Sequence, residues 1–148
     1  MCKFAPDLEF DKMRKDIEIP VVKDIEVAVV KELNEEKTAE VFNVYLLNQK
    51  KETILNVLVS SKGYGKNPST GEKITTSVLR HFIGDVDGKS YAKIEPIIEE
   101  VFGINNEYWV SFSLGGKMYD KKFIFLPETI IDSNMVHVPM LEKAGVVI

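Results

Sequence analysis

The sequence predicts an all-β fold, an antiparallel β-sandwich of the immunoglobulin or fibronectin kind with one or two short helical turns. Apolar and polar residues alternate with a period of two in at least six segments, which places successive side chains on opposite faces of a strand. Turn-forming residues separate these segments, and no long helical pattern lies between them. Short strands joined by close turns favour an antiparallel sandwich over a sheet built from βαβ units.

The length and composition indicate one domain. A chain of 148 residues, 45% apolar and 28% charged, is long enough to bury a single core. The net charge of −4 arises within residues 1–40, which hold eleven acids and seven bases. We therefore expect an acidic segment over residues 1–20, ordered in part, followed by one sandwich domain over residues 21–148.

Three strands are expected in the first half of the chain. Residues 25–33 are rich in β-branched side chains and end at a polar break over 34–38. Residues 41–47 carry apolar side chains on both faces, as in a central strand, and residues 48–53 form the next turn. Residues 54–59 alternate as a half-buried strand of an antiparallel sheet.

The middle of the chain contains the least regular segment. Residues 61–73 combine Gly63, Gly65, Pro68 and Gly71 with polar residues, which predicts one long connection. Alternation resumes over 74–83, and the turn at 85–89 contains an Asp-Gly pair that predicts a hairpin with residues 90–94.

The last third contains the best helical candidate and the strongest hairpin. Residues 95–103 begin with Glu-Pro and end at glycine, which predicts one or two helical turns. Residues 107–114 and 117–126 are two alternating runs joined by a Gly-Gly pair. Residues 135–138 and 145–148 are expected as short strands around a turn at 141–144. Over residues 40–95, the strand order and the turn from Gly84 to Ser90 resemble immunoglobulin-like domains.

Several classes of protein do not fit the composition. Cys2 is the only cysteine, so an internal disulfide is excluded and a reducing, cytoplasmic compartment is expected. The charged amino terminus lacks the apolar run of a secretory signal, and no apolar run is long enough to span a bilayer. The acidic balance disfavours general nucleic-acid binding. No cofactor is predicted.

No catalytic or metal site is predicted either. His81 and Ser77 lie four residues apart on one expected strand, roughly 13 Å by strand rise, which is too far for a nucleophile and its base. His137, the other histidine, lies in another expected strand. One terminal cysteine and two distant histidines do not form a zinc site. The Asp85-x-Asp87-Gly88 turn lacks the later ligands of a calcium loop.

A ligand site is the alternative interpretation of the irregular segment. Residues 61–73 contain glycines, lysines and hydroxyls, although not in the order of a phosphate-binding P-loop. A small-ligand receptor or an enzyme would use this segment together with residues that follow it. The candidate ligand-binding residues are Lys62, Tyr64, Lys66, Arg80 and His81. The aromatic residues Tyr108, Trp109, Phe112, Phe123 and Phe125 are expected in the core, with a base-stacking platform as the alternative.

Four stretches resemble a family of short bacterial proteins that often carry the label of phenylalanyl-tRNA synthetase alpha subunit. They are Ser60–Gly65, Thr76–Phe82, Asn106–Ser111 and Tyr119–Pro127. The resemblance implies an association with RNA or tRNA. A synthetase, however, needs a catalytic domain of several hundred residues and arginines that hold ATP phosphates, and this chain has only Arg14 and Arg80. We expect no aminoacylation.

The leading functional hypothesis is a non-enzymatic, cytoplasmic module for protein interaction or assembly. It rests on the many predicted strands and on the lack of an assembled catalytic group. The partner is an unknown protein or a second copy of the chain, because sheet edges promote self-association unless they are protected.

Overall fold

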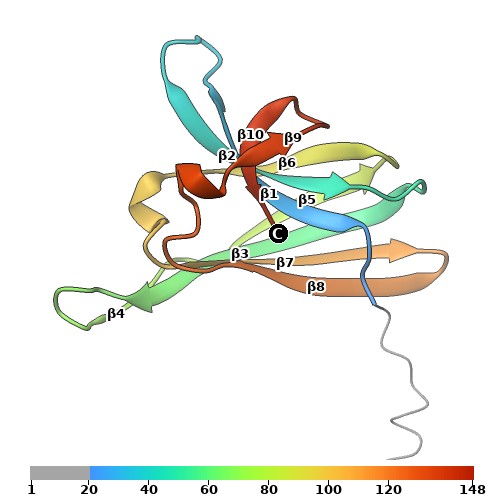
Figure 1. Ribbon diagram of the computed structural model, residues 1–148. Coiled ribbons are helices and arrows are strands. Elements are labelled where there is room, and N and C mark those ends of the chain that lie inside the picture. Colours follow the sequence, from blue (N-terminus) through green and yellow to red (C-terminus); the bar gives the residue numbers. More distant parts are fainter. Residues whose placement is uncertain (1–20) are drawn as a thin grey trace, which may run out of the picture.

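The computed structural model describes residues 21–148, and the predicted acidic segment 1–20 lies outside the described residues. The described residues form an all-β sandwich of two antiparallel sheets with two single turns of 3-10 helix (Figure 1). The strands are β1 (Ile25–Leu33), β2 (Glu40–Asn48), β3 (Ile54–Lys66), β4 (Lys73–Thr75), β5 (Leu79–Val86), β6 (Ser90–Ile97), β7 (Asn105–Leu114), β8 (Lys117–Phe125), β9 (Val136–Val138) and β10 (Lys143–Val147). The helical turns are η1 (Glu99–Val101) and η2 (Asp132–Asn134).

Strand pairing divides the molecule into two layers. Sheet A has the order β6-β2-β1-β10-β9. Sheet B has the order β4-β3-β7-β8, and β5 also pairs with β3. The long strand β3 pairs with β7 along one side, and with β5 and then β4 along the other. It is therefore the central strand of sheet B.

The main core lies between the sheets. Alternate residues of the long strands β3 and β7 point inward and are mostly buried, as expected for the inner face of a sandwich. Sheet B contributes its largest side chains through β7 and β8, where Tyr108 packs edge-on against Phe125 and Phe112 stacks on Tyr119. Core members from both sheets are Val27, Val29, Val44, Leu46, Val57, Val59, Val110 and Phe123.

Six strands follow the neighbour order of immunoglobulin sandwiches. Strands β1, β2 and β6 lie where such domains place A, B and E, and β3, β7 and β8 lie where they place C, F and G. Strand β5, beside β3, occupies the position of the extra strand in variable-type domains. The immunoglobulin-like identity itself stays a prediction.

Strand β3 is longer than predicted. The glycines predict a loop over Ser61–Lys66, but these residues continue the strand, since β7 and β4 supply partners on both sides. Ile104 packs over the two glycines of this segment, and a Cβ on Gly65 would lie 2.9 Å from its side chain. The glycines therefore mark a close approach within a strand rather than a turn.

The predicted strand over 74–83 is broken into β4 and β5. Between them, the side chain of Thr76 takes the place of a backbone acceptor. The Gly63 amide donates to Thr76 Oγ1 at 2.7 Å. The predicted hairpin at 85–89 is also different. Strand β5 pairs with β3 and β6 pairs with β2, so this turn crosses from sheet B to sheet A. Within the predicted helical stretch 95–103, residues 95–97 are the end of β6, and one helical turn is present as η1.

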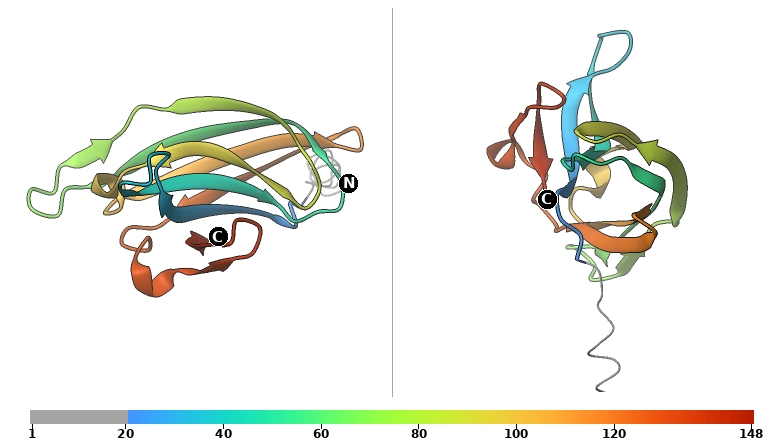
Figure 2. Two further views of the ribbon diagram at one scale, coloured as in Figure 1. Left: turned by 90° about the horizontal axis from the view of Figure 1, so that it is seen from above. Right: turned by 90° about the vertical axis from the view of Figure 1, so that its right-hand side faces the viewer.

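Strand β1 is buried on both faces. Val27 and Val29 point into the main core, while Ala28 and Val30 pack under the C-terminal segment with Leu47 and Val138. This segment, which carries β9 and β10, lies alongside β1 at the margin of the sandwich (Figure 2). Its cover explains why β1 is a continuous apolar run rather than an alternating one.

A polar cluster lies on the outer face of sheet A. The Tyr45 hydroxyl donates to Glu32 Oε2 at 2.6 Å, and Lys143 Nζ lies 3.5 Å from Glu32 Oε1. Burial raises the pKa of Glu32, but hydrogen bonds from Tyr45 and Asn43 and the charge of Lys143 outweigh it, so the net pKa is lowered. Burial, and then Glu32, raise the pKa of Tyr45, which keeps its hydroxyl protonated as the donor.

Tyr45→Phe is expected to make the free energy of unfolding less dependent on pH in the acidic range. A carboxyl with a lowered folded-state pKa stabilises the fold above its unfolded pKa, and this contribution is lost as the pH falls through the folded value. The free-energy difference between wild type and Tyr45→Phe should therefore be largest at neutral pH and shrink below the ordinary value of 4.5. Urea unfolding at several pH values measures it. Tyr91→Phe, which alters the adjacent ring and leaves the Tyr45–Glu32 bond in place, should show a pH-independent difference.

Candidate functional site

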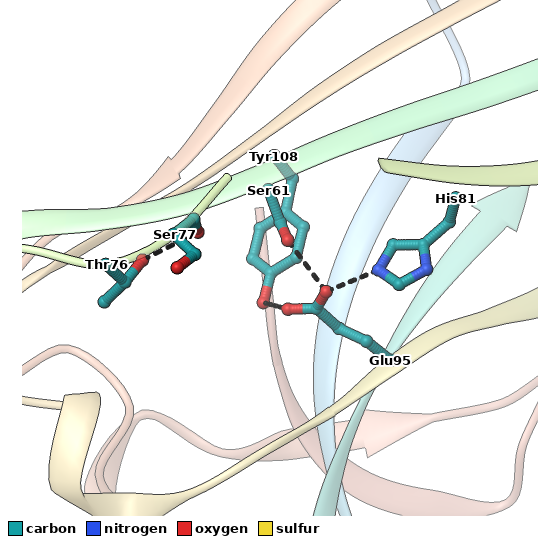
Figure 3. Close-up of polar contacts among 6 residues, drawn as sticks. All are labelled: Ser61, Thr76, Ser77, His81, Glu95 and Tyr108. Carbon is teal, nitrogen blue, oxygen red and sulfur yellow. Dashed lines mark hydrogen bonds and ion pairs between the residues drawn. The ribbon is translucent and has the colours of Figure 1, made fainter. Parts of the chain in front are cut away.

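Four strands bring polar side chains together around Glu95. Glu95 comes from β6 of sheet A, and its three partners come from sheet B: Ser61 on β3, His81 on β5 and Tyr108 on β7 (Figure 3). The sheet register explains this convergence, because Ser61 lies opposite Tyr108 and Val59 lies opposite His81. The Glu95 cluster is thus a polar bridge between the two layers.

The hydrogen bonds of the Glu95 cluster are short. Ser61 Oγ donates to Glu95 Oε1 at 2.7 Å, and His81 Nε2 lies 2.7 Å from the same oxygen. The Tyr108 hydroxyl donates to Glu95 Oε2 at 3.1 Å. Burial raises the pKa of Tyr108, and the nearby Glu95 carboxylate raises it further. The phenol therefore remains a proton donor at any ordinary pH.

A pocket of about 360 Å³ opens beside this cluster. It lies between the sheets, where the Thr76–Val78 break separates β4 from β5 and where β6 ends. Ser61, Glu95 and Tyr108 lie on one polar side of it, and apolar residues that include Leu79, Ile97 and Ile98 form much of its wall. The other polar residues of the lining are Lys62, Thr76, Ser77 and Asn106. A mostly apolar cavity with a few convergent polar groups is the usual form of a small-ligand site.

The cluster is not a nucleophile with its base. Ser61 and His81 both bond to Glu95 Oε1, so the imidazole is not placed to take the proton of the hydroxyl. Ser77, the other hydroxyl considered for His81, lies between β4 and β5, where its carbonyl accepts from Thr76 Oγ1. Ser61, His81 and Tyr108 hold and orient the carboxylate of Glu95 itself, which leaves it suited to accept a hydrogen bond from a ligand.

The five residues predicted to bind a ligand do not form one site. Strand alternation places Lys62, Tyr64 and Arg80 on the outer face of sheet B and His81 on the inner face. Lys62 Nζ lies 3.9 Å from Glu107 Oε2, and the Tyr64 hydroxyl lies 3.5 Å from Glu107 Oε1. Lys66 lies opposite Lys73 at the end of β3, beside a second pocket of about 660 Å³ that is also lined by Tyr64 and Pro127.

An aromatic patch on the outer face of sheet B is the second candidate site. Phe82 is 72% exposed, Trp109 44% and Leu58 41%. Leu58 pairs with Phe82, and Trp109 pairs with Ser60, the next residue of β3 on the same face. These three residues, here called the aromatic patch, are contiguous. The prediction that Trp109 is a core residue is therefore wrong, whereas Tyr108, Phe112, Phe123 and Phe125 are buried as predicted.

Cations flank the aromatic patch. Arg80 and Trp109 lie on either side of Ser60, and Lys122 Nζ lies 4.7 Å from the centre of the Trp109 ring. The Glu107 carboxylate on this face is largely buried against Lys62, and the exposed acids of the neighbouring strands are Asp120 and Asp85, whose carboxylate accepts from the Asn56 amide. The aromatic patch is thus locally basic on a chain of net charge −4.

Within residues 21–148, no group of three or more His, Cys, Asp or Glu side chains is placed to hold a metal ion. No helix of this part of the chain is long and apolar enough to cross a membrane. In comparisons with known proteins, no protein-family model matches the chain and no curated protein is significantly similar to it. The resemblance to the family labelled as a synthetase subunit stays a prediction, and function must be inferred from the two candidate sites.

Proposed function

We propose that the protein is a non-enzymatic, cytoplasmic interaction module that binds an acidic protein surface on the outer face of sheet B. The observation that carries this proposal is the aromatic patch. Large aromatic side chains exposed together on one sheet face are costly in water, and they are the residue types that dominate binding energy at protein interfaces. The absence of a paired nucleophile and base in the Glu95 cluster supports a binding role over a catalytic one.

The charge around the patch supports an acidic partner. Arg80 and Lys122 border the aromatic side chains, and Lys66 and Lys73 lie directly opposite each other farther along the same sheet. Like charges directly opposite each other destabilise a sheet. A carboxylate-bearing partner would relieve this repulsion, and basic rim residues would steer it to the patch.

A protein fits the patch better than a nucleic acid. Stacking aromatics with Arg and Lys are also the means by which single strands are bound. Here, however, Asp120 lies in register beside Ser111 on the same face, and the chain carries a net charge of −4. Both features oppose a continuous phosphate backbone. The aliphatic Leu58 within the patch offers a protein contact but no base-stacking surface.

Trp109 allows a direct test because it is the only tryptophan in the chain. Titration with a synthetic peptide rich in glutamate and leucine is expected to change its fluorescence, and Phe82→Ser should weaken the apparent affinity by about tenfold, as loss of an aromatic anchor does. Leu33→Ser is the matched control, since Leu33 is 54% exposed at the end of β1. It should bind as the wild type does.

Each other outcome of this titration identifies a different function. A response to oligothymidylate that falls steeply with salt would replace the protein partner with single-stranded nucleic acid. A fluorescence change that depends only on protein concentration, lost in Phe82→Ser, would indicate a homo-oligomer. No response to any of these probes, or equal binding by Phe82→Ser and Leu33→Ser, would contradict a role for the aromatic patch.

A further inference from the structure

We propose that the pocket beside Glu95 binds a primary ammonium group carried on an apolar chain. This site is separate from the partner surface proposed above, because Glu95 lies between the sheets and the aromatic patch lies on the outer face of sheet B. The proposed interaction role does not require the pocket, so either proposal can be contradicted without affecting the other.

The first step of the argument is the acceptor that Glu95 leaves unused. A carboxylate offers roughly four lone-pair positions. Ser61 and His81 occupy Oε1, whereas Tyr108 is the one partner of Oε2 found among the described residues. Oε2 therefore has capacity for one more donor, and Glu95 is one of the residues that line the pocket.

The second step is that the carboxylate is held in place before any ligand arrives. The Glu95 side chain is 13% exposed, and its donors Ser61 and Tyr108 are buried. Three hydrogen bonds from three different strands fix the position of both oxygens. A preorganised, poorly solvated acceptor loses little freedom on binding, which favours affinity.

The third step selects the ligand by charge and polarity. A protonated amine forms a charge-assisted hydrogen bond with a carboxylate, whereas phosphate and carboxylate ligands are repelled by it. Lys62 also lines the pocket, but its ammonium lies 3.9 Å from Glu107 Oε2 and forms no ion pair with Glu95. Leu79, Ile97 and Ile98 provide an apolar wall for the rest of the ligand. A volume of about 360 Å³ suits a small molecule or a single side chain.

The test compares three probes of one shape and different charge. Hexylamine, 1-hexanol and hexanoate are titrated into the full chain, and binding is followed by calorimetry and by NMR shifts. Hexylamine is expected to bind at least about tenfold more tightly than hexanol, as a hydrogen bond to a charged group should provide, and hexanoate should not bind. Equal binding of the three probes would overturn the proposal. So would no detectable binding of hexylamine at a concentration on the order of 10 mM, which corresponds to a very weak affinity.

Two variants separate the carboxylate from the cavity. Glu95→Gln should remove the preference for hexylamine over hexanol. Ile98→Trp places a bulky ring at the mouth of the pocket, at a residue that is 59% exposed, and should abolish binding of both probes without loss of fold. Leu33→Trp is the control at an exposed site away from the pocket and should bind as the wild type does. Hexylamine binding that survives both Glu95→Gln and Ile98→Trp would place the ligand elsewhere.

The ammonium could come from a free amine or from a lysine side chain, and a further probe distinguishes them. Nα-acetyl-lysine methylamide carries the same ammonium on a peptide backbone. Tighter binding of this compound than of hexylamine would identify a lysine of another protein as the natural ligand, and weaker binding would identify a free amine.

Discussion

Asn48→Ala is expected to lower the free energy of unfolding by about 3 kcal/mol, since burial of unsatisfied polar groups costs roughly 1–3 kcal/mol for each group. Asn48 is fully buried at the end of β2. Its side-chain amide donates to the carbonyl oxygens of Glu52, Val86 and Asp87, and its oxygen accepts from the Lys50 amide. One side chain therefore forms hydrogen bonds with backbone groups of two turns, and Asn48→Ala would leave these groups without that partner.

A matched control exists in the same chain. Asn34 also organises a turn, since its side-chain oxygen accepts from the Thr38 amide at 2.9 Å, but Asn34 is only half-buried and this hydrogen bond is exposed. Water can replace its contacts, so Asn34→Ala should cost no more than about 1 kcal/mol. Urea unfolding of both variants measures the difference. An equal loss for the two would show that the buried contacts of Asn48 are not what hold the turns together.

Gly88→Ala is the second large effect that we expect. A Cβ at Gly88 would lie 2.1 Å from the carbonyl oxygen of Lys51 and 2.4 Å from its carbonyl carbon. Both are backbone atoms, so no side chain can rotate away, and the β5–β6 turn would have to separate from the β2–β3 turn. We expect a loss of about 3 kcal/mol, at the upper end of the cost of overpacking.

Gly103→Ala is the control for this substitution. A Cβ added at Gly103 would lie 3.4 Å from its nearest neighbour, Glu128 Oε1. This is an ordinary contact with the end of a flexible side chain. This variant should lie within about 1 kcal/mol of the wild type, because alanine also restricts the unfolded chain. Thermal unfolding of both variants provides the comparison. A Gly88→Ala protein as stable as Gly103→Ala would mean that the two turns are not packed as described.

The strands could be predicted wherever their pattern is local. The β-branched run and the polar break after it predict the bounds of β1, and the apolar patterns of β2 and β7 predict these strands within a few residues. The Gly-Gly pair predicts the β7–β8 hairpin, where both glycines have positive φ. For β3 the glycines predict a turn and hence too short a strand, whereas Gly63 and Gly65 lie in the strand because Ile104 packs closely against them. That contact joins distant parts of the chain and leaves no local mark.

The candidate sites differ in how much the sequence could reveal. Ser61, His81 and Tyr108 meet Glu95 only because three strands of sheet B face the end of β6, and no spacing in the sequence predicts such a meeting. Glu95 itself was assigned to a helical turn. Trp109 was different, since alternation already placed it with Ser111 and Ser113 on the face opposite Tyr108. That pattern was the signal for its exposure.

The double burial of β1 has a consequence for how the chain folds during synthesis. Ala28 pairs with Val147, so β1 meets its second partner only when β10 is made. At about 5–20 residues per second, this delay is on the order of ten seconds. Throughout it, β1 presents an open strand edge and the apolar side chains of Ala28 and Val30 to other molecules. Late closure by the C-terminal strands therefore makes β1 a segment of the nascent chain that needs protection from aggregation.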